Sequence, residues 1–278
     1  YWSKPQIAAR QHPNMASTRS FLNSLWARGA TGALGFDPNL EATYADRMRI
    51  RVPGNVSGLT PHIDGGSVER WLDPGYQRVY GDVFDGRWED LNIFDGTTRL
   101  DAEELPFPNV STVFRTFQGW LAVSPQGPGD GTLQVVPMVK EAMCFLLLQP
   151  FFEGTDAEPL CGAAVGKQHK MTPEFHERLL DGLISIPHVG SGDTVFWHPD
   201  VIHAVEKLHA GSINASVFYI ASVPHCAKNA AYVEKQRASF VSGQAPPDFP
   251  QEDREVTYKG RATESDLSPL GRRQMGFD

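Results

Sequence analysis

From about Asp46 to Val223 the chain is made of short runs of alternating apolar and polar residues, broken by Gly, Pro, Asn and Asp. A period of two is typical of β-strands, and frequent turn residues keep each strand short. The clearest runs lie at residues 47–52, 113–123, 132–137, 183–187, 193–197 and 215–223. The sequence therefore predicts a mainly β protein whose short strands pack as a sandwich or jelly roll.

Helical patterns flank these strands and interrupt them once. Phe21, Leu22, Leu25 and Trp26 form an apolar stripe with helical spacing, and Ser17 could cap the start of that helix. We expect two more helices. One follows Thr172 as the cap with Pro173 in the first turn, and the other covers residues 226–239.

The order of these patterns predicts a single domain over residues 1–278. We expect a helical part at 1–45, a jelly-roll core at 46–225, and a helix with an irregular tail at 226–278. Within the core, residues 67–108 are rich in turn residues and aromatics, which is typical of an ordered insertion. Those aromatics could form the rim of a pocket or a small core of their own. Because the chain starts at Tyr1, we also expect that an N-terminal region is missing.

Composition limits the partners that we expect. The 278 residues are 41% hydrophobic and 21% charged, with a formal net charge of −8 and no basic run, so neither nucleic acid nor a membrane is an expected partner. The three cysteines are too few and too widely spaced for a disulfide framework, which favours the cytoplasm. A small molecule is the expected partner, and the oligomeric state stays open.

The strongest chemical signal is the pair His62 and Asp64 in the segment Thr60-Pro61-His62-Ile63-Asp64-Gly65-Gly66. On a strand, residues i and i+2 point to the same face, so the imidazole and the carboxylate would converge. Glycines at 65 and 66 would let other groups approach the backbone closely.

His203 is the candidate that would complete a metal site. It follows a Gly192-Asp193 turn and an apolar strand, and a late strand of a jelly roll lies beside an early one. Two histidines and one carboxylate form the facial triad of non-haem Fe(II) oxygenases, which leaves positions on the metal for a cosubstrate and O₂. Asp200 is a rival carboxylate, although Pro199 bends the chain between it and the preceding strand.

The remaining histidines are weaker candidates. His198 precedes a proline and is expected to shape a turn, and solvent or a backbone carbonyl would satisfy His209 and His225. Four others have no useful spacing and are expected at the surface or in loops: His12, His169, His176 and His188.

Taken together, these motifs resemble the Fe(II)/2-oxoglutarate-dependent dioxygenase superfamily, and more closely its YbiU-like family. The resemblance covers most of residues 45–278 and rests on residues 61–71, 117–121, 131–133, 197–203, 219–224 and 260–267. It implies a double-stranded β-helix, an Fe(II) centre at His62, Asp64 and His203, and 2-oxoglutarate and O₂ as cosubstrates. The implied reaction is oxidation of an unidentified small molecule.

The chain departs from the superfamily where the distal carboxylate of 2-oxoglutarate usually binds. The superfamily has an Arg or Lys two residues before a Ser, whereas this chain has Asn214 before Ser216. Ser216 can fill the serine role, but another cation must replace the missing one. Arg115 is the first choice, since it lies on an otherwise apolar strand face and a buried guanidinium needs an anion. Weaker choices are Lys207, Arg49 and Arg51.

Alternatives remain open at the level of sequence. Arg115 could instead lie at an exposed strand end or pair with an Asp. Arg70, a candidate substrate contact, could pair with Glu69 or pack on Trp71. The missing cation near Asn214 also fits a cupin-like metal enzyme that does not use 2-oxoglutarate. A non-catalytic binding domain is a third alternative, although its ligands would be expected to have decayed.

Overall fold

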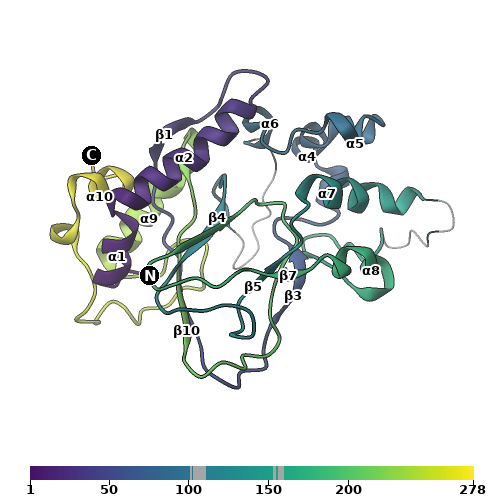
Figure 1. Cartoon of the computed structure of the whole chain (residues 1–278). Coiled ribbons are helices and arrows are strands. Elements are labelled where there is room, and N and C mark those ends of the chain that lie inside the picture. The colour runs from purple at the N-terminus through teal and green to yellow at the C-terminus, as the bar shows by residue number, and fades with distance from the viewer. Residues whose placement is uncertain (101, 103–110, 153–154, 156–159) are drawn as a thin grey trace.

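The computed structural model describes residues 1–100, 102, 111–152, 155 and 160–278 (Figure 1). The chain has mixed α and β structure, and the described strands form three antiparallel sheets of two, four and five strands. The predicted insertion at 67–108 is described except for residues 101 and 103–108, which lie outside the described residues.

Two of the sheets carry most of the strands. The five-stranded sheet has the order β6-β3-β9-β5-β7 and the four-stranded sheet the order β2-β10-β4-β8, while β1 pairs with β11. The strands are β1 (Asp37–Glu41), β2 (Met48–Arg51), β3 (Leu59–Ile63), β4 (Gln118–Ala122), β5 (Leu133–Val135), β6 (His169–Lys170), β7 (Ile184–Ser185), β8 (Thr194–Trp197), β9 (His203–Val205), β10 (Ala215–Tyr219) and β11 (Pro224–His225).

An apolar core joins the two larger sheets. Trp120 and Val217 from the four-stranded sheet share one buried cluster with Leu133 and Ile186 from the five-stranded side. Burial of this surface is the main force that holds the sheets together. Strands far apart in sequence are neighbours in both sheets, since β3 pairs with β9 and β2 pairs with β10.

Helices surround the sheets. Figure 1 shows α1, α2, α9 and α10 gathered on one side, and α4, α5, α7 and α8 on the other. The helices are α1 (Lys4–Arg10), α2 (Pro13–Gly29), α3 (Glu69–Leu72), α4 (Pro74–Val79), α5 (Gly81–Phe84), η1 (Trp88–Asp90), α6 (Gly96–Arg99), α7 (Val139–Leu148), η2 (Gln149–Phe151), α8 (Pro173–Asp181), α9 (Ala227–Ser242), η3 (Glu264–Asp266) and α10 (Pro269–Gln274). Every helix among the described residues is too short or too polar to cross a bilayer.

The predicted helices are present, with one correction at a helix start. Helix α2 begins at Pro13 with His12 as its cap, so the prediction that Ser17 caps it was wrong. Proline fits the first turn of a helix because its missing N–H would be unpaired there anyway. Helix α8 begins at Pro173 after Thr172 and α9 covers the third predicted helix, so both of these predictions were confirmed.

The strand predicted over 113–123 is shorter in the structure. It begins only at Gln118, because the preceding segment is held by other parts of the chain. The backbone N–H of Phe114 donates to the Asn229 side chain on α9, and the N–H of Thr116 donates to the carbonyl of Ser222. The alternation of side chains along a strand therefore does not predict which way the side chain of residue 115 points.

The described part of the insertion belongs to the main core and also lines a cavity. Trp71, Tyr80 and Val83 pack in one cluster with Ile63 of β3 and Met143 of α7. The same insertion contributes cavity-lining side chains. Both alternatives considered for its aromatics therefore apply in part.

Candidate metal centre

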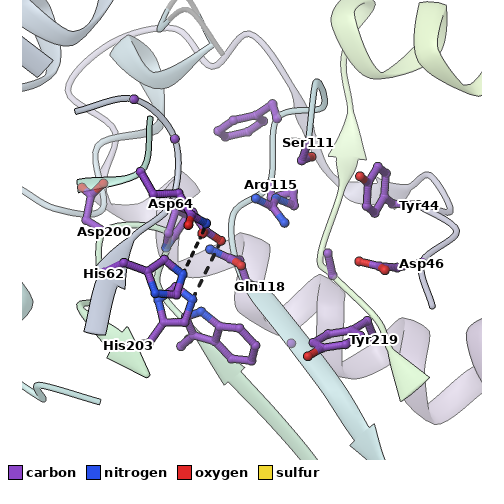
Figure 2. A pocket seen from close by; sticks show the side chains of 18 of the residues that line it. Tyr44, Asp46, His62, Asp64, Ser111, Arg115, Gln118, Asp200, His203 and Tyr219 are labelled. Atoms are coloured by element: carbon purple, nitrogen blue, oxygen red, sulfur yellow. Dashed lines mark hydrogen bonds and ion pairs between the residues drawn. The ribbon is translucent and has the colours of Figure 1, made fainter. Parts of the chain in front are cut away.

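Three side chains converge at one end of the five-stranded sheet. His62 at the end of β3 lies directly opposite His203 at the start of β9, and Asp64 follows β3 immediately. The Nε2 atoms of His62 and His203 lie 3.2 and 3.9 Å from the Asp64 carboxylate oxygens (Figure 2). One ligand atom from each residue lies within 4.8 Å of the others, so the group could hold a metal ion.

Backbone carbonyls orient both imidazoles toward Asp64. Nδ1 of His62 lies 2.7 Å from the carbonyl of Thr60, and Nδ1 of His203 lies 3.0 Å from the carbonyl of Val201. A carbonyl can only accept, so Nδ1 carries a proton in each ring, which leaves Nε2 as the nitrogen that faces Asp64 and could ligate a metal. Histidines that ligate metals usually donate their other ring N–H to a carbonyl or carboxylate in this way.

The charges of the three groups suit a cation. Burial raises the pKa of Asp64, but its contacts with both imidazoles outweigh burial and hold that pKa below its usual range. Burial lowers the pKa of His62, but the hydrogen bond to Asp64 outweighs burial and raises it, so a metal ion would take the place of the proton that His62 shares with Asp64. Burial is the largest influence on His203 and lowers its pKa. An ionised carboxylate and neutral imidazoles are the protonation states that a divalent metal requires.

Arg70 fastens the backbone next to the carboxylate. Its guanidinium donates to the carbonyl of Asp64 at 2.6 Å and to the carbonyl of Gly66 at 3.2 Å. Gly65 between them has φ +81°, and a Cβ there would lie 2.8 Å from the Tyr76 hydroxyl. The tight turn after β3 therefore depends on glycine and on this arginine.

The same guanidinium reaches the segment before the second histidine. Arg70 pairs with Asp200 at 3.1 Å, and Asp200 also accepts hydrogen bonds from Arg99 and Tyr80. Asp200 is 2% exposed and belongs to this ion-pair network, outside the His–Asp–His group. Arg70 is 1% exposed and pairs with Asp200 rather than with Glu69.

A cavity of about 490 Å³ opens beside the three converging residues. Both sheets and the insertion line it. Its described lining includes Tyr44, Asp46, Arg47, Arg49, Leu59, His62, Asp64, Arg70, Tyr76, Arg99, Ser111, Arg115, Gln118, Trp120, Lys167, Gln168, Trp197, Asp200, His203, Tyr219 and Phe249. A space of this size accommodates a small organic molecule together with a cosubstrate.

Arg115 projects into this cavity, as Figure 2 shows. Its charge lowers the pKa of Asp64 and opposes the effect of burial on the pKa of Asp46, so it acts on carboxylates on both sides. Arg115 makes no hydrogen bond or ion pair with any of the described residues. Alternation along a single strand over 113–123 would place Gln118 and Trp120 on the face opposite Arg115. Both line the same cavity as Arg115, because β4 starts only after Arg115.

The other residues predicted to bind the cosubstrate lie elsewhere. Neither Asn214 nor Ser216 is part of the described cavity lining. Ser216 pairs with Ile50, whereas the next residue, Val217, belongs to the core between the sheets, so Ser216 faces the opposite side. The structure does not bring these two residues to the converging histidines.

Two histidines expected at the surface are buried. His169 on β6 and His176 on α8 are both 0% exposed, and their rings lie 5.3 Å apart. The aromatic neighbours Trp71 and Phe175 exclude solvent there, which sequence spacing alone does not indicate. His209 meets the carbonyl of Ile213 at 2.8 Å, as expected of a histidine satisfied by the backbone.

Sequence reasoning missed one residue at the centre itself. The side-chain amide of Gln168 donates to Asp64 at 3.0 Å, although 104 residues separate them. The segment around Gln168 carries no motif, because its place beside Asp64 comes from the pairing of β6 with β3. Only the tertiary structure could reveal this contact.

The fold and the converging residues define a class: antiparallel sheets that carry a His–Asp–His group able to hold a metal ion. The Gig2-like family matches residues 1–277, and the chain belongs to this family. It is 42% identical over 281 residues to the uncharacterised protein YbiU of Escherichia coli strain K12, covering 100% of this chain and 66% of that protein.

Solved structures agree with this assignment. A hypothetical protein from Escherichia coli, crystallised at high pH, superposes with a TM-score of 0.93 at 42% identity, covering 100% of this chain and 69% of that one. A protein of Salmonella typhimurium LT2 named "Putative Oxidoreductase" gives 0.93 at 43% identity, covering 99% and 67%. GlcNAc Inducible Gene 2 of Candida albicans gives 0.86 at 32% identity, covering 100% and 65%. The chain thus spans about two thirds of the length of these relatives.

Proposed function

We propose that the protein is a non-haem Fe(II)- and 2-oxoglutarate-dependent oxygenase that hydroxylates or otherwise oxidises a small organic molecule. The observation that carries this proposal is the convergence of His62, Asp64 and His203 beside a cavity. Two imidazoles and one carboxylate are the ligand set of such iron centres. The name of the Salmonella relative points to the same broad class of reaction.

The proposal extends to the fold. We take the two larger sheets as the halves of a double-stranded β-helix, within a single domain over residues 1–278. Support comes from the antiparallel order of both sheets and from the pairing of early with late strands, β3 with β9 and β2 with β10.

The donor set fits the metal. Asp64 offers an ionised oxygen, and His62 and His203 offer Nε2 lone pairs fixed by their carbonyl partners. When bound, iron and 2-oxoglutarate would supply the oxidising chemistry, in which R–H, O₂ and 2-oxoglutarate give R–OH, succinate and CO₂. The protein supplies the ligand geometry, and Trp120 and Trp197 contribute apolar surface to the cavity wall, which would limit the access of water.

Arg115 is proposed to anchor the distal carboxylate of the cosubstrate. It is half-buried in the cavity and has no anionic partner among the described residues. A guanidinium taken partly out of water gains most from a carboxylate, whose two oxygens match its fork. This role would replace the cation that the superfamily places where Asn214 stands.

Anaerobic titration with Fe(II), with and without 2-oxoglutarate, tests the proposal. The chelate of iron with the keto acid gives a weak visible charge-transfer band, which we expect in the wild type and not in Asp64→Ala. Asp85→Ala, which removes a carboxylate that is 63% exposed, serves as the matched control. A screen of metabolites for succinate release then seeks the substrate. Unchanged iron binding and turnover in Asp64→Ala would refute the assignment.

A second function is favoured by one observation. Asn214 stands two residues before Ser216, and neither residue belongs to the described cavity lining. The Arg or Lys that usually anchors the distal carboxylate of 2-oxoglutarate is therefore absent from its usual place. This favours a cupin-like metal enzyme that does not use 2-oxoglutarate. In the same titration, such an enzyme would bind Fe(II) through the three ligands and give no band when 2-oxoglutarate is added.

A further inference from the structure

The cavity is rich in positive charge, although the chain as a whole is acidic. The described lining has six cationic side chains, namely Arg47, Arg49, Arg70, Arg99, Arg115 and Lys167. It has three carboxylates, namely Asp46, Asp64 and Asp200, whereas the whole chain has a formal net charge of −8. Charge of one sign gathered in a cleft raises the local concentration of ligands of the opposite sign.

Three of these cations already have carboxylate partners. Arg70 and Arg99 share Asp200, and Arg47 lies 3.6 Å from Asp46. Within the described part of the chain, Arg49, Arg115 and Lys167 have no carboxylate partner. Under the proposed function, a divalent metal and a dianionic cosubstrate cancel each other's charge. The excess of positive side chains in the cavity lining therefore remains.

Besides Arg115, the fold directs Arg49 inward, and Arg49 too has no carboxylate partner among the described residues. On β2 it lies opposite Val217 of β10, and Val217 belongs to the core between the sheets, so Arg49 is on the inner face. Among the described residues, the one hydrogen-bond partner of its side chain is the Tyr219 hydroxyl at 3.5 Å. Tyr219 lies across the cavity from His62 and His203 in Figure 2.

Its neighbour on the same face shows what a structural arginine looks like here. Arg51 is 5% exposed and donates to the carbonyls of Gly131 and Glu206 and to the Asn55 side chain. Arg49 is half-buried, and the part of the chain that the structure describes offers it no comparable set of acceptors. A guanidinium in that position gains free energy from an anionic ligand.

We propose that the substrate is a small organic anion, and that Arg49, with the Tyr219 hydroxyl beside it, binds its acidic group. This inference rests on the proposed function in taking the ligand as a substrate and in assigning Arg115 to the cosubstrate. A carboxylate and a phosphate share the required chemistry, since both present oxygens that match the guanidinium fork.

Calorimetric titration with matched pairs of small molecules tests this inference. Each pair is an acid and its uncharged counterpart: a carboxylate with its amide, or a phosphate with its alcohol. The protein is anaerobic, loaded with Fe(II) and saturated with 2-oxoglutarate. We expect binding by at least one acid, with its uncharged counterpart at least tenfold weaker. The two arms of the panel distinguish carboxylate from phosphate recognition.

Variants assign the effect to one residue. Arg49→Gln should weaken the acid about 10- to 100-fold and change the affinity for 2-oxoglutarate less than twofold, because a charged hydrogen bond is lost at one site only. Arg115→Gln should do the reverse. Arg254→Gln is the matched control, since that side chain is 82% exposed and lies outside the described cavity lining.

The outcomes separate this inference from the proposed function. Failure of every acid to bind, equal binding of uncharged counterparts, or full affinity in Arg49→Gln would each overturn the anion site. Failure of 2-oxoglutarate to bind the wild type would overturn the oxygenase. The acid titration can then be repeated on the protein without iron or cosubstrate, where dependence on Arg49 would still support the anion site.

Discussion

The contact of Arg70 with both metal-ligating segments gives the sharpest prediction. Arg70 donates to the carbonyls of Asp64 and Gly66 on one side and pairs with Asp200, which precedes His203, on the other. Arg70→Met removes these contacts while filling much of the same volume. We expect the variant to fold, to be less stable, and to bind Fe(II) more weakly.

The size of the loss in stability follows from the surroundings of Arg70. Removing one partner of a buried ion pair costs about 3–5 kcal/mol. The low end applies to the pair itself because Asp200 keeps Arg99, and each carbonyl left without its donor adds about 1 kcal/mol. With two carbonyls affected the total is about 5 kcal/mol, so at roughly 2 °C per kcal/mol for a domain of this size the melting temperature should fall by about 10 °C.

The effect on metal binding separates positioning from stability alone. Losing a residue that holds a metal ligand in place typically lowers metal affinity about 10- to 100-fold. We expect this loss for Arg70→Met under conditions where the variant is folded. Arg99→Met is the matched control, because Arg99 also pairs with Asp200 but makes no contact with the Asp64 carbonyl. It should lose comparable stability and keep most of its affinity for Fe(II).

Anaerobic Fe(II) titration and thermal unfolding, measured on both variants, supply the two readouts. Arg70→Lys should recover part of the metal affinity. The lysine ammonium can reach one of these acceptors, but it cannot bridge the backbone carbonyls and Asp200 at once as the forked guanidinium does. If Arg70→Met and Arg99→Met lose metal affinity equally, or neither loses any, Arg70 has no specific role in holding the ligands.

Two further predictions concern single side chains. Arg115→Gln should weaken 2-oxoglutarate binding about 10- to 100-fold and leave the affinity for iron unchanged, as measured by titration of the visible band. An equal loss in Arg254→Gln would contradict this. Burial lowers the pKa of His176 to about 4. The unfolded chain, with a pKa near 6.5, therefore binds a proton between about pH 6.5 and 4 that the folded chain does not. Stability should be full above pH 6.5 and fall by about 3 kcal/mol toward pH 4 from this group. In urea unfolding, His176→Phe should flatten that slope and the exposed His225→Asn should not; the same slope in both variants would refute the assignment.

Much of the local structure could be predicted from sequence, because local signals decide it. Proline in the first turn marked α8, and periodic apolar residues marked the helix that became α2. The apolar composition of residues 142–148 by itself indicates a core segment, and Met143 and Leu147 there are fully buried. Ends of elements were less predictable, as at β4, because contacts with Asn229 and Ser222 compete with strand geometry.

The candidate centre divides in the same way. The spacing of His62 and Asp64 and the position of His203 after an apolar strand are local patterns, and they sufficed to name the three residues that the structure brings within 4.8 Å. The roles of Arg70 and Gln168 were not predictable, because each depends on a partner more than 100 residues away.

The sequence by itself determined which side chains can ligate a metal and that β-strands would carry the two histidines, since residue type and alternation are properties of short segments. Only the tertiary structure decided that β3 lies beside β9, that an arginine joins the two ligand segments, and which cavity arginines have no carboxylate partner among the described residues. The reason is physical: the pairing of distant strands and the balance of buried charge depend on the whole chain being folded at once.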